Sequence, residues 1–211
     1  MSDLTELGTA LLTLNEEKVD ILIKQKMTSG EDPLKIIEEC NRAMVEVGNL
    51  FEKSEYFISE LVMSGEIFTG VMAKLEPMLG ERKQKSLSKG KVVIGTVKDD
   101  IHDIGKNIVV TIFKGNGFEV IDLGVDVPAQ TFVKTMKEEG ARVLGLSALL
   151  NFTFPEMKKV VDELSAAGLR DEVKVIIGGA PCNEHVRQFT GADYYAEDAA
   201  AGARICHEIY G

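Results

Sequence analysis

Residues 91–107 read KVVIGTVKDDIHDIGKN, an apolar run that passes into a polar loop and then into a helical pattern. Most residues of 91–97 are β-branched, and such a run is typical of a parallel strand that is covered on both faces. Comparable runs recur at 142–147 and 173–177, and helical stretches separate them. This alternation of strand and helix predicts an α/β fold with a doubly wound parallel sheet.

The whole second part of the chain follows this alternation. We expect strands over 91–97, 118–123, 142–147, 173–177 and 193–196, and helices over 105–115, 128–139, 155–168, 183–189 and 198–209. Five such strands favour the flavodoxin-like order 2-1-3-4-5, in which ligands bind beyond the carboxyl ends of the strands. The loops after the first, third and fourth strands are therefore expected to carry the chemistry.

The first part of the chain has helical periodicity instead. Its apolar spacing and capping residues predict helices over 3–13, 15–28, 33–51 and 55–79, which together form a four-helix bundle. A basic, polar stretch follows and is typical of a surface linker. The sequence therefore predicts a helical bundle over 1–80, a linker over 81–90 and a sheet domain over 91–211.

Composition narrows the class of protein. The 211 residues are 45% hydrophobic and 27% charged, which argues against wholesale disorder, and a net charge of −10 argues against nucleic-acid binding. No apolar run approaches the ~18 residues that span a bilayer, and the N-terminus has no signal-peptide pattern. Three widely spaced cysteines without a CxxC pair do not suggest disulfides or a zinc ribbon. We expect a cytoplasmic protein that binds neither membrane nor nucleic acid.

The loop after the first strand contains His102, with Asp100 two residues before it and Gly105 three residues after it. An imidazole that ligates a metal through one nitrogen usually donates its other N–H to a carboxylate, and Asp100 could accept that bond. Gly105 would let a bulky ligand approach the backbone. The alternative is an ordinary loop histidine.

The third strand runs into SALLNFT at residues 147–153, and the fourth ends in Gly178-Gly179. A glycine pair at the end of a strand lets a ligand lie against the backbone, although a tight turn would also explain it. Neither loop has the GxGxxG or GxxxxGK[ST] pattern that cradles a di- or triphosphate. We therefore expect a different kind of ligand at this edge.

Three motifs, taken in order, resemble the cobalamin-binding signature: Asp100-x-His102-x-x-Gly105, Ser147-x-Leu149 and Gly178-Gly179. Residues 1–80 are similar to the helical cap that precedes the cobalamin domain in methionine synthase and in the corrinoid proteins of methyltransfer systems. The matching stretches are VGNLF at 47–51 and YFI at 56–58, and Ser59 replaces the proline that usually follows the aromatic pair. The resemblance covers essentially the whole chain.

The resemblance implies cobalamin as cofactor, in the form of methylcobalamin and cob(I)alamin or a related corrinoid. His102 would replace the cofactor's own base as lower ligand of the cobalt (base-off, His-on). Asp100 would hold the other N–H of the imidazole, and Thr153 would complete a proton relay. Ser147 would hydrogen-bond the buried base of the nucleotide tail. The implied cofactor-binding residues are Asp99, Asp100, Ile101, His102, Asp103, Ile104, Gly105, Ser147, Leu149, Asn151, Thr153, Gly178, Gly179, Ala196, Phe51 and Ile58.

Phe51 and Ile58 match cap positions that pack on the methyl-bearing face of the cofactor. Plain bundle core is the alternative for both.

The function that the resemblance implies is that of a methyl carrier, a methyltransferase component without independent turnover. A substrate:corrinoid methyltransferase would load the methyl group, and a second methyltransferase would pass it to tetrahydrofolate or coenzyme M. A reductive activase would restore oxidised cobalt. A methylamine, betaine, methanol or an aryl methyl ether could be the donor. The alternatives are the small subunit of an adenosylcobalamin-dependent mutase and a cobalamin-sensing regulator.

Overall fold

The computed structural model describes residues 4–79 and 88–211. The chain divides into two compact units, of which the first reaches Ser88 and includes Lys114–Gly117, and the second comprises Lys89–Phe113 and Phe118–Gly211. Residues 81–87 of the predicted linker lie outside the described part. In the described ranges no helix is both long and apolar enough to span a bilayer.

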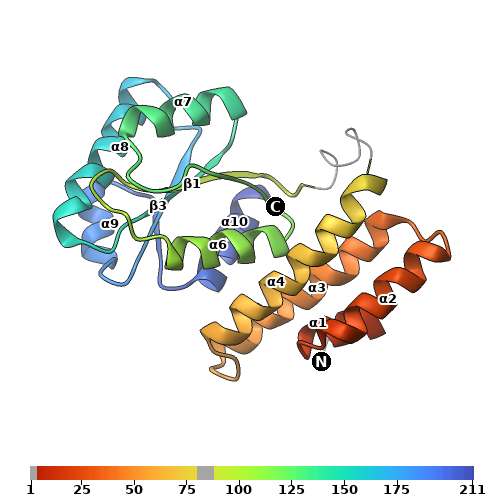
Figure 1. Cartoon of the computed structure of the whole chain (residues 1–211). Helices are drawn as coiled ribbons and strands as arrows, with labels where there is room; N and C mark the ends of the chain where they lie inside the picture. The colour runs from red at the N-terminus through yellow and green to blue at the C-terminus, as the bar shows by residue number, and fades with distance from the viewer. Residues whose placement is uncertain (1–3, 80–87) are drawn as a thin grey trace. The chain divides into compact units, whose positions relative to one another are not determined.

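The first unit contains the four predicted helices, α1 (Glu6–Leu12), α2 (Glu16–Thr28), α3 (Pro33–Glu52) and α4 (Ile58–Leu75), followed by the short 3-10 helix η1 (Glu76–Met78) (Figure 1). Side-chain caps start the second and third helices, because Asn15 accepts from the N–H of Lys18 at 3.0 Å and Asp32 from that of Leu34 at 3.1 Å. The core side chains come from all four helices and include Leu7, Leu11, Ile23, Ile36, Met44, Leu61 and Leu75.

Helix α4 is shorter at both ends than the predicted 55–79. It begins at Ile58, where the carboxylate of Glu60 accepts the N–H of Phe57 at 2.8 Å and so caps the first turn. It ends at Leu75 because Pro77 has no N–H to donate to the carbonyl of Ala73, and the chain continues as the 3-10 helix η1. The existence of the helix was therefore predictable, and its ends depend on local capping.

The second unit is a parallel sheet of five strands: β1 (Lys91–Thr96), β2 (Glu119–Asp122), β3 (Val143–Ser147), β4 (Lys174–Gly178) and β5 (Tyr194–Ala196). Their order is β2-β1-β3-β4-β5 and every pairing is parallel, which confirms the predicted fold class. The connecting helices are α6 (Ile104–Gly115), α7 (Ala129–Glu139), α8 (Phe154–Ala166), α9 (Glu184–Thr190) and α10 (Ala199–Tyr210), and a 3-10 turn, η2 (Asn151–Thr153), precedes α8.

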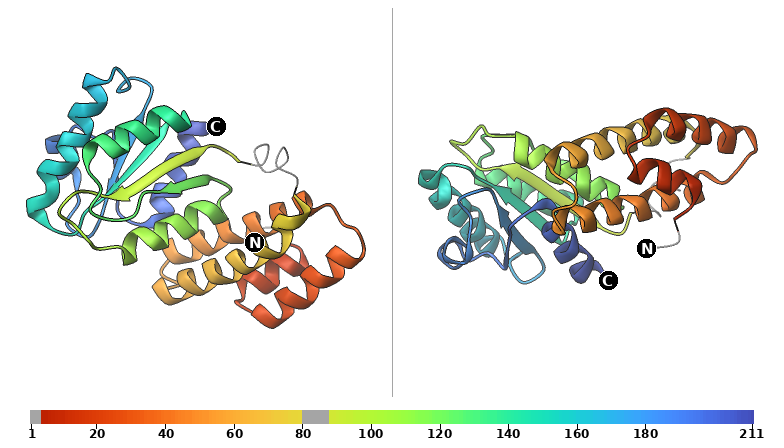
Figure 2. Two further views of the ribbon diagram at one scale, coloured as in Figure 1. Left: turned by 45° about the horizontal axis from the view of Figure 1, so that its top comes forward. Right: turned by 90° about the horizontal axis from the view of Figure 1, so that it is seen from below.

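Helices cover both faces of the sheet. Helices α7, α8 and α9 pack on one face, with Phe132, Val160 and Val186 in the same apolar core. Helices α6 and α10 lie on the other face (Figures 1 and 2), and Gly202 of α10 approaches the ring of Phe113 of α6. With both faces covered, the carboxyl ends of the strands and the loops that follow them stay accessible.

The strand register brings four residues into one row at that edge. Thr96 pairs with Ser147, and Gly178 lies between Ser147 and Ala196. The predicted binding residues Ser147, Gly178 and Ala196 therefore come from three neighbouring strands and lie side by side.

Candidate functional site

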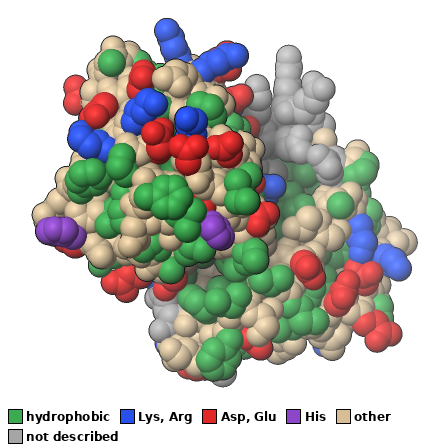
Figure 3. Space-filling model, turned by 60° about the vertical axis from the view of Figure 1, so that its left-hand side comes forward, with side chains coloured by type: hydrophobic (Ala, Val, Ile, Leu, Met, Phe, Trp, Pro, Cys, Tyr) green, Lys and Arg blue, Asp and Glu red, His purple; other side chains and the backbone are tan. Residues whose placement is uncertain are grey.

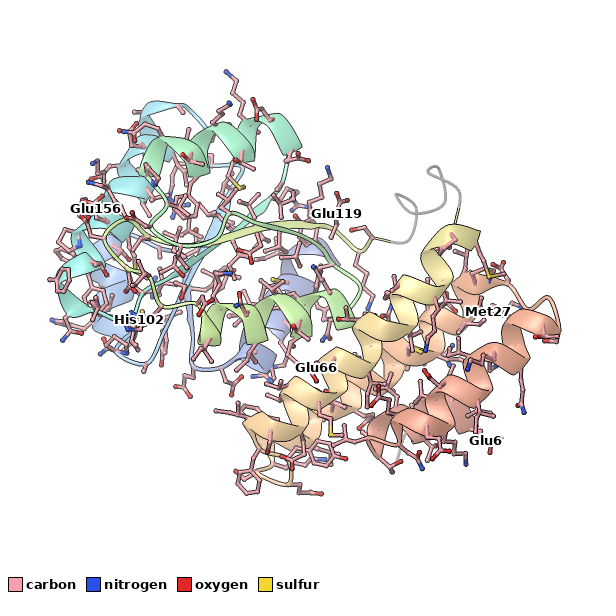
Figure 4. All side chains as sticks on the ribbon, viewed as in Figure 1. Glu6, Met27, Glu66, His102, Glu119 and Glu156 are labelled. Atoms are coloured by element: carbon pink, nitrogen blue, oxygen red, sulfur yellow. The ribbon has the colours of Figure 1, made fainter. Side chains whose placement is uncertain are left out.

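Hydrogen bonds join the loops that follow β1, β3 and β4. The carboxylate of Asp100 accepts from Leu149 in the loop after β3, and Ala148 donates its N–H to the carbonyl of Gly178 at 3.1 Å. Figure 4 shows His102 in the loop between β1 and α6, at the opposite end of the sheet from Glu119. The topology thus assembles three distant segments around His102.

Asp100 is completely buried, and its carboxylate accepts four hydrogen bonds. One oxygen accepts from the backbone N–H of His102 at 3.0 Å and from its ring Nδ1 at 2.7 Å. The other accepts from the backbone N–H of Leu149 at 2.7 Å and of Leu150 at 3.1 Å. Burial on its own raises the pKa of the Asp100 carboxyl, but these hydrogen bonds outweigh it and hold the pKa below its ordinary value. Asp100 is therefore a carboxylate at neutral pH.

The imidazole of His102 has one nitrogen engaged and one available. Because Asp100 is ionised and can only accept, Nδ1 of the neutral ring carries the proton and Nε2 keeps its lone pair. The side chain is 47% exposed. This is the tautomer in which histidine ligates a metal through Nε2 while a carboxylate orients the ring. In the described ranges, this site included, no cluster of three or more His, Cys, Asp or Glu side chains could hold a metal ion, so His102 offers a single protein ligand.

Thr153 has a different hydrogen-bond partner from the one that the predicted proton relay requires. Its buried hydroxyl donates to the carbonyl oxygen of Leu150 at 2.7 Å, and the N–H of Leu150 donates to Asp100. Thr153 thus reaches the carboxylate through the Leu150 peptide unit. In this structure the hydroxyl stabilises the turn that presents two backbone N–H groups to Asp100.

The three predicted glycines differ in what the fold requires of them. Gly179 has a φ of +128°, and a Cβ there would lie 1.9 Å from the carbonyl oxygen of Ala148, so the turn itself demands glycine. Gly178 has only the carbonyl oxygen of Ala196 near its missing Cβ, at 3.8 Å, and Gly105 has nothing within 4 Å. These two glycines leave open room at the edge of the sheet.

Apolar side chains surround this room. Ile101 is 73% exposed and Ile104 78%, and Leu149 is also exposed. Figure 3, which brings the left-hand side of Figure 1 forward, shows many hydrophobic side chains on this face. Phe152, between the predicted residues Asn151 and Thr153, is 70% exposed as well. It is not among the predicted site residues, although an aromatic residue in the loop SALLNFT can indicate a ligand contact. Exposed apolar side chains in the same loops as His102 suit a large, largely apolar ligand.

The other predicted residues of this unit are more peripheral. Asp99, Asp103 and Asn151 are exposed in the loops after β1 and β3, whereas Ser147 and Ala196 are half-buried at strand ends.

Phe51 and Ile58 lie in the first unit. Phe51 is partly buried near the end of α3, whereas Ile58 is 58% exposed at the start of α4 beside the exposed Phe57. The alternative hypothesis for Ile58, a place in the bundle core, is therefore wrong.

Two family models match the chain. The description of each is "B12 binding domain", and they cover residues 90–204 and 4–76.

The chain also resembles characterised proteins over nearly its whole length. It is 40% identical over 208 residues to dimethylamine corrinoid protein 1 of Methanosarcina acetivorans, which covers 98% of this chain and 96% of that protein. A cobalamin-binding protein from Desulfitobacterium hafniense DCB-2 superposes with a TM-score of 0.81 at 38% identity over 100% of both chains. A chain of the methanol:cobalamin methyltransferase complex of Methanosarcina barkeri gives a TM-score of 0.85 at 27% identity over 97% of this chain and 78% of its own. Together with the two domain matches, these similarities show that the chain belongs to the family of corrinoid proteins built from B12-binding domains, with a corrinoid as its cofactor.

Proposed function

We propose that this protein carries a methyl group on a corrinoid whose cobalt has Nε2 of His102 as its lower ligand. The observation that carries the proposal is the hydrogen bond of 2.7 Å between Asp100 and Nδ1 of His102, which leaves Nε2 as a donor toward a metal. A bound corrinoid supplies a cobalt that accepts a methyl group from one partner and releases it to another.

The residues around His102 fit such a group. Gly105 and Gly178 leave room beside the strand ends, and the exposed side chains of Ile101, Ile104 and Leu149 offer apolar contacts to a macrocycle. Gly105 is the second residue of α6, and glycine in a helix interior costs up to about 1 kcal/mol relative to alanine. Because neither its φ nor its packing demands glycine, the open room at Gly105 supports a role in ligand binding. We propose that the nucleotide tail runs past Gly105, Ser147, Leu149, Gly178 and Gly179 and ends near Ala196.

Asp100 can serve both states of the imidazole. While Nε2 ligates, the carboxylate holds the proton on Nδ1 and orients the ring. If a bound corrinoid released Nε2, that nitrogen would be able to accept a proton, while Asp100 would still hold the proton on Nδ1. The fixed N–H donors of His102, Leu149 and Leu150 keep Asp100 ionised throughout. We propose that this pair couples the binding and release of the lower ligand to the movement of one proton.

The relatives indicate the class of partner. One is named a dimethylamine corrinoid protein, and another belongs to a methanol:cobalamin methyltransferase complex. We propose that a substrate:corrinoid methyltransferase loads this protein and that a second methyltransferase passes the methyl group to tetrahydrofolate or coenzyme M. A reductive activase restores oxidised cobalt. We propose that the protein acts in the cytoplasm, and the free thiols of Cys40, Cys182 and Cys206 support a reducing environment.

The ligand assignment is tested by reconstitution with hydroxocobalamin. We expect the reduced Co(II) form of the wild type to show nitrogen splitting in its electron paramagnetic resonance spectrum that changes when histidine is labelled with ¹⁵N. His102→Ala should lose this splitting. His185→Ala, which removes an exposed histidine on α9, is the matched control and should keep it. Identical spectra for His102→Ala and the wild type would exclude His102 as the ligand.

The carrier assignment needs a separate experiment. Protein loaded with a ¹³C-labelled methyl group should keep it when mixed with coenzyme M or tetrahydrofolate alone. It should release the group only after a methyltransferase of the matching class is added. Rapid transfer to a free acceptor by this chain alone would show an independent enzyme and contradict the proposal.

A further inference from the structure

The loop between β2 and α7 runs alongside the loop that carries His102. Thr96 donates its N–H to the carbonyl of Gly124 at 2.9 Å and accepts from the N–H of Val127 at 3.0 Å, and Val97 forms an isolated parallel bridge with Val127. Residues 124–127 therefore continue the pairing of the sheet beyond the end of β1. Asp126 lies within this stretch, opposite Asp99 and Asp100.

Asp126 contacts the neighbouring loop through both its side chain and its backbone. Its carboxylate oxygen Oδ1 accepts the N–H of Asp99 at 2.8 Å, and its own N–H donates to the carbonyl of Asp100 at 2.9 Å. Asp99 and Asp100, which stand three and two positions before His102, are thus both held by one residue of another loop. Thr96 fixes the far side, because its hydroxyl donates to the carbonyl of His102 at 2.9 Å.

The backbone on both sides of this contact has an unusual conformation. Asp99 has a φ of +66° and Asp126 a φ of +54°, so that two of the non-glycine residues with positive φ in the described ranges face each other. Aspartate tolerates this region better than most residues, but it still costs free energy relative to ordinary backbone. Such conformations persist where surrounding contacts hold them, and they gather at functional sites.

The geometry points to Asp126 as a positioning residue for the His102 imidazole. By holding Asp99 and Asp100 from the β2–α7 loop, it keeps the Asp100 carboxylate in the one orientation that accepts from Leu149, Leu150 and His102 together. Without this contact the carboxylate can turn away from Nδ1. A neutral imidazole then carries its proton on Nε2 more often, and a protonated Nε2 cannot ligate cobalt.

Only the effect of Asp126 on cobalt ligation rests on the proposed function. The tautomer of His102 exists in the protein without cofactor, where ¹⁵N chemical shifts of the imidazole distinguish Nδ1–H from Nε2–H. His102→Gln identifies the signal among the three histidines. If the tautomer experiment failed, the positioning role of Asp126 would be excluded, but the assignment of His102 as the cobalt ligand would be unaffected.

Three substitutions separate the side chain of Asp126 from its backbone. Asp126→Asn keeps an acceptor and tolerates positive φ, so we expect the wild-type tautomer ratio. Asp126→Gly favours the backbone conformation but removes the acceptor, and Asp126→Ala removes both. For these two we expect about a fivefold shift toward Nε2–H, which corresponds to ~1 kcal/mol, the usual net worth of one hydrogen bond.

Asp162→Ala is the control for the loss of one acidic side chain, because Asp162 pairs with Lys158 on the exposed face of α8. It should leave the ratio unchanged. Thermal unfolding of each variant separates a local change from a loss of fold, and Asp126→Gly keeps the experiment decisive if Asp126→Ala does not fold. An unchanged ratio in folded Asp126→Gly, or a shifted ratio in Asp126→Asn, would overturn the proposal.

Discussion

Substituting Asp100 by asparagine exchanges one carboxylate oxygen for an NH₂ group at a site where all four neighbours are donors. If the amide oxygen faced His102, the NH₂ group would oppose the N–H groups of Leu149 and Leu150. If the oxygen faced those two, the NH₂ group would oppose the backbone N–H of His102, while the imidazole could still adapt by moving its proton from Nδ1 to Nε2. We therefore expect the second arrangement.

The magnitude follows from that arrangement. One buried backbone N–H, that of His102, loses its acceptor, which costs about 1–3 kcal/mol. The bonds from Leu149 and Leu150 lose their charge assistance, and relief from burying a carboxylate offsets part of this loss. We expect Asp100→Asn to lower the free energy of unfolding of the cofactor-free protein by about 2 kcal/mol. Corrinoid binding should weaken about tenfold or more, because ligation then requires the disfavoured tautomer at a cost of at least ~1.4 kcal/mol.

Urea unfolding measures the first quantity, and titration of the folded protein with aquocobalamin, followed by absorbance, measures the second. Asp162→Asn is the matched control, because it makes the same chemical change on the exposed face of α8, at a residue outside the predicted binding set. The side chain of Asp162 is 60% exposed, and its carboxylate accepts from Nζ of Lys158 at 2.8 and 3.1 Å. A stability within about 0.5 kcal/mol of the wild type, together with an unchanged Nδ1–H signal, would refute the role assigned to the carboxylate.

Three further outcomes follow from the geometry. Gly179→Ala should lower the free energy of unfolding in urea by about 3 kcal/mol, since its Cβ meets the carbonyl of Ala148 in a backbone region that is nearly restricted to glycine; a loss under ~1 kcal/mol would contradict this. Gly105→Ala should raise the stability of the cofactor-free protein by up to about 1 kcal/mol and weaken aquocobalamin binding, and unchanged affinity would mean that the open room is not used. Burial, with a contribution from the charge of Lys89, lowers the pKa of His207 in the folded protein. The unfolded chain therefore binds more protons than the folded one. The folded state has its full stability above about pH 6.5 and loses this contribution as the pH falls through the folded pKa. His207→Phe should reduce the change of the urea midpoint with pH below about pH 6.5, and a slope equal to that of the wild type would exclude His207 as its source.

Much of the fold was predictable because its determinants are local or periodic. Runs of β-branched residues such as 91–97 mark the buried strands, and turn residues separate them from amphipathic helices. Short-range caps such as Asn15 and Asp32 set helix starts within a few residues of their own positions. The strand order 2-1-3-4-5 was predictable because few orders suit five alternating strand and helix units, and the structure confirms it.

The site was predictable only where its partners are close in sequence. Asp100 and His102 are two residues apart, so the pairing of carboxylate and ring nitrogen follows from the DxH spacing. The other carboxylate oxygen accepts from residues 49 and 50 positions away, and sequence spacing does not reveal that these two N–H groups point at it. Thr153 is predicted to complete the proton relay, and only the structure shows that its hydroxyl donates to the carbonyl of Leu150, whose N–H donates to Asp100.

By itself, the sequence determined the strands, the helices, their order and the family, because periodicity, capping and motif spacing are properties of the chain. Only the tertiary structure decided the state of the site. The burial of Asp100, its four donors and its contact with Asp126 through the backbone exist because three loops meet at one edge of the sheet. That meeting makes the carboxylate an acceptor with a lowered pKa, and so determines which nitrogen of His102 is free to bind a metal.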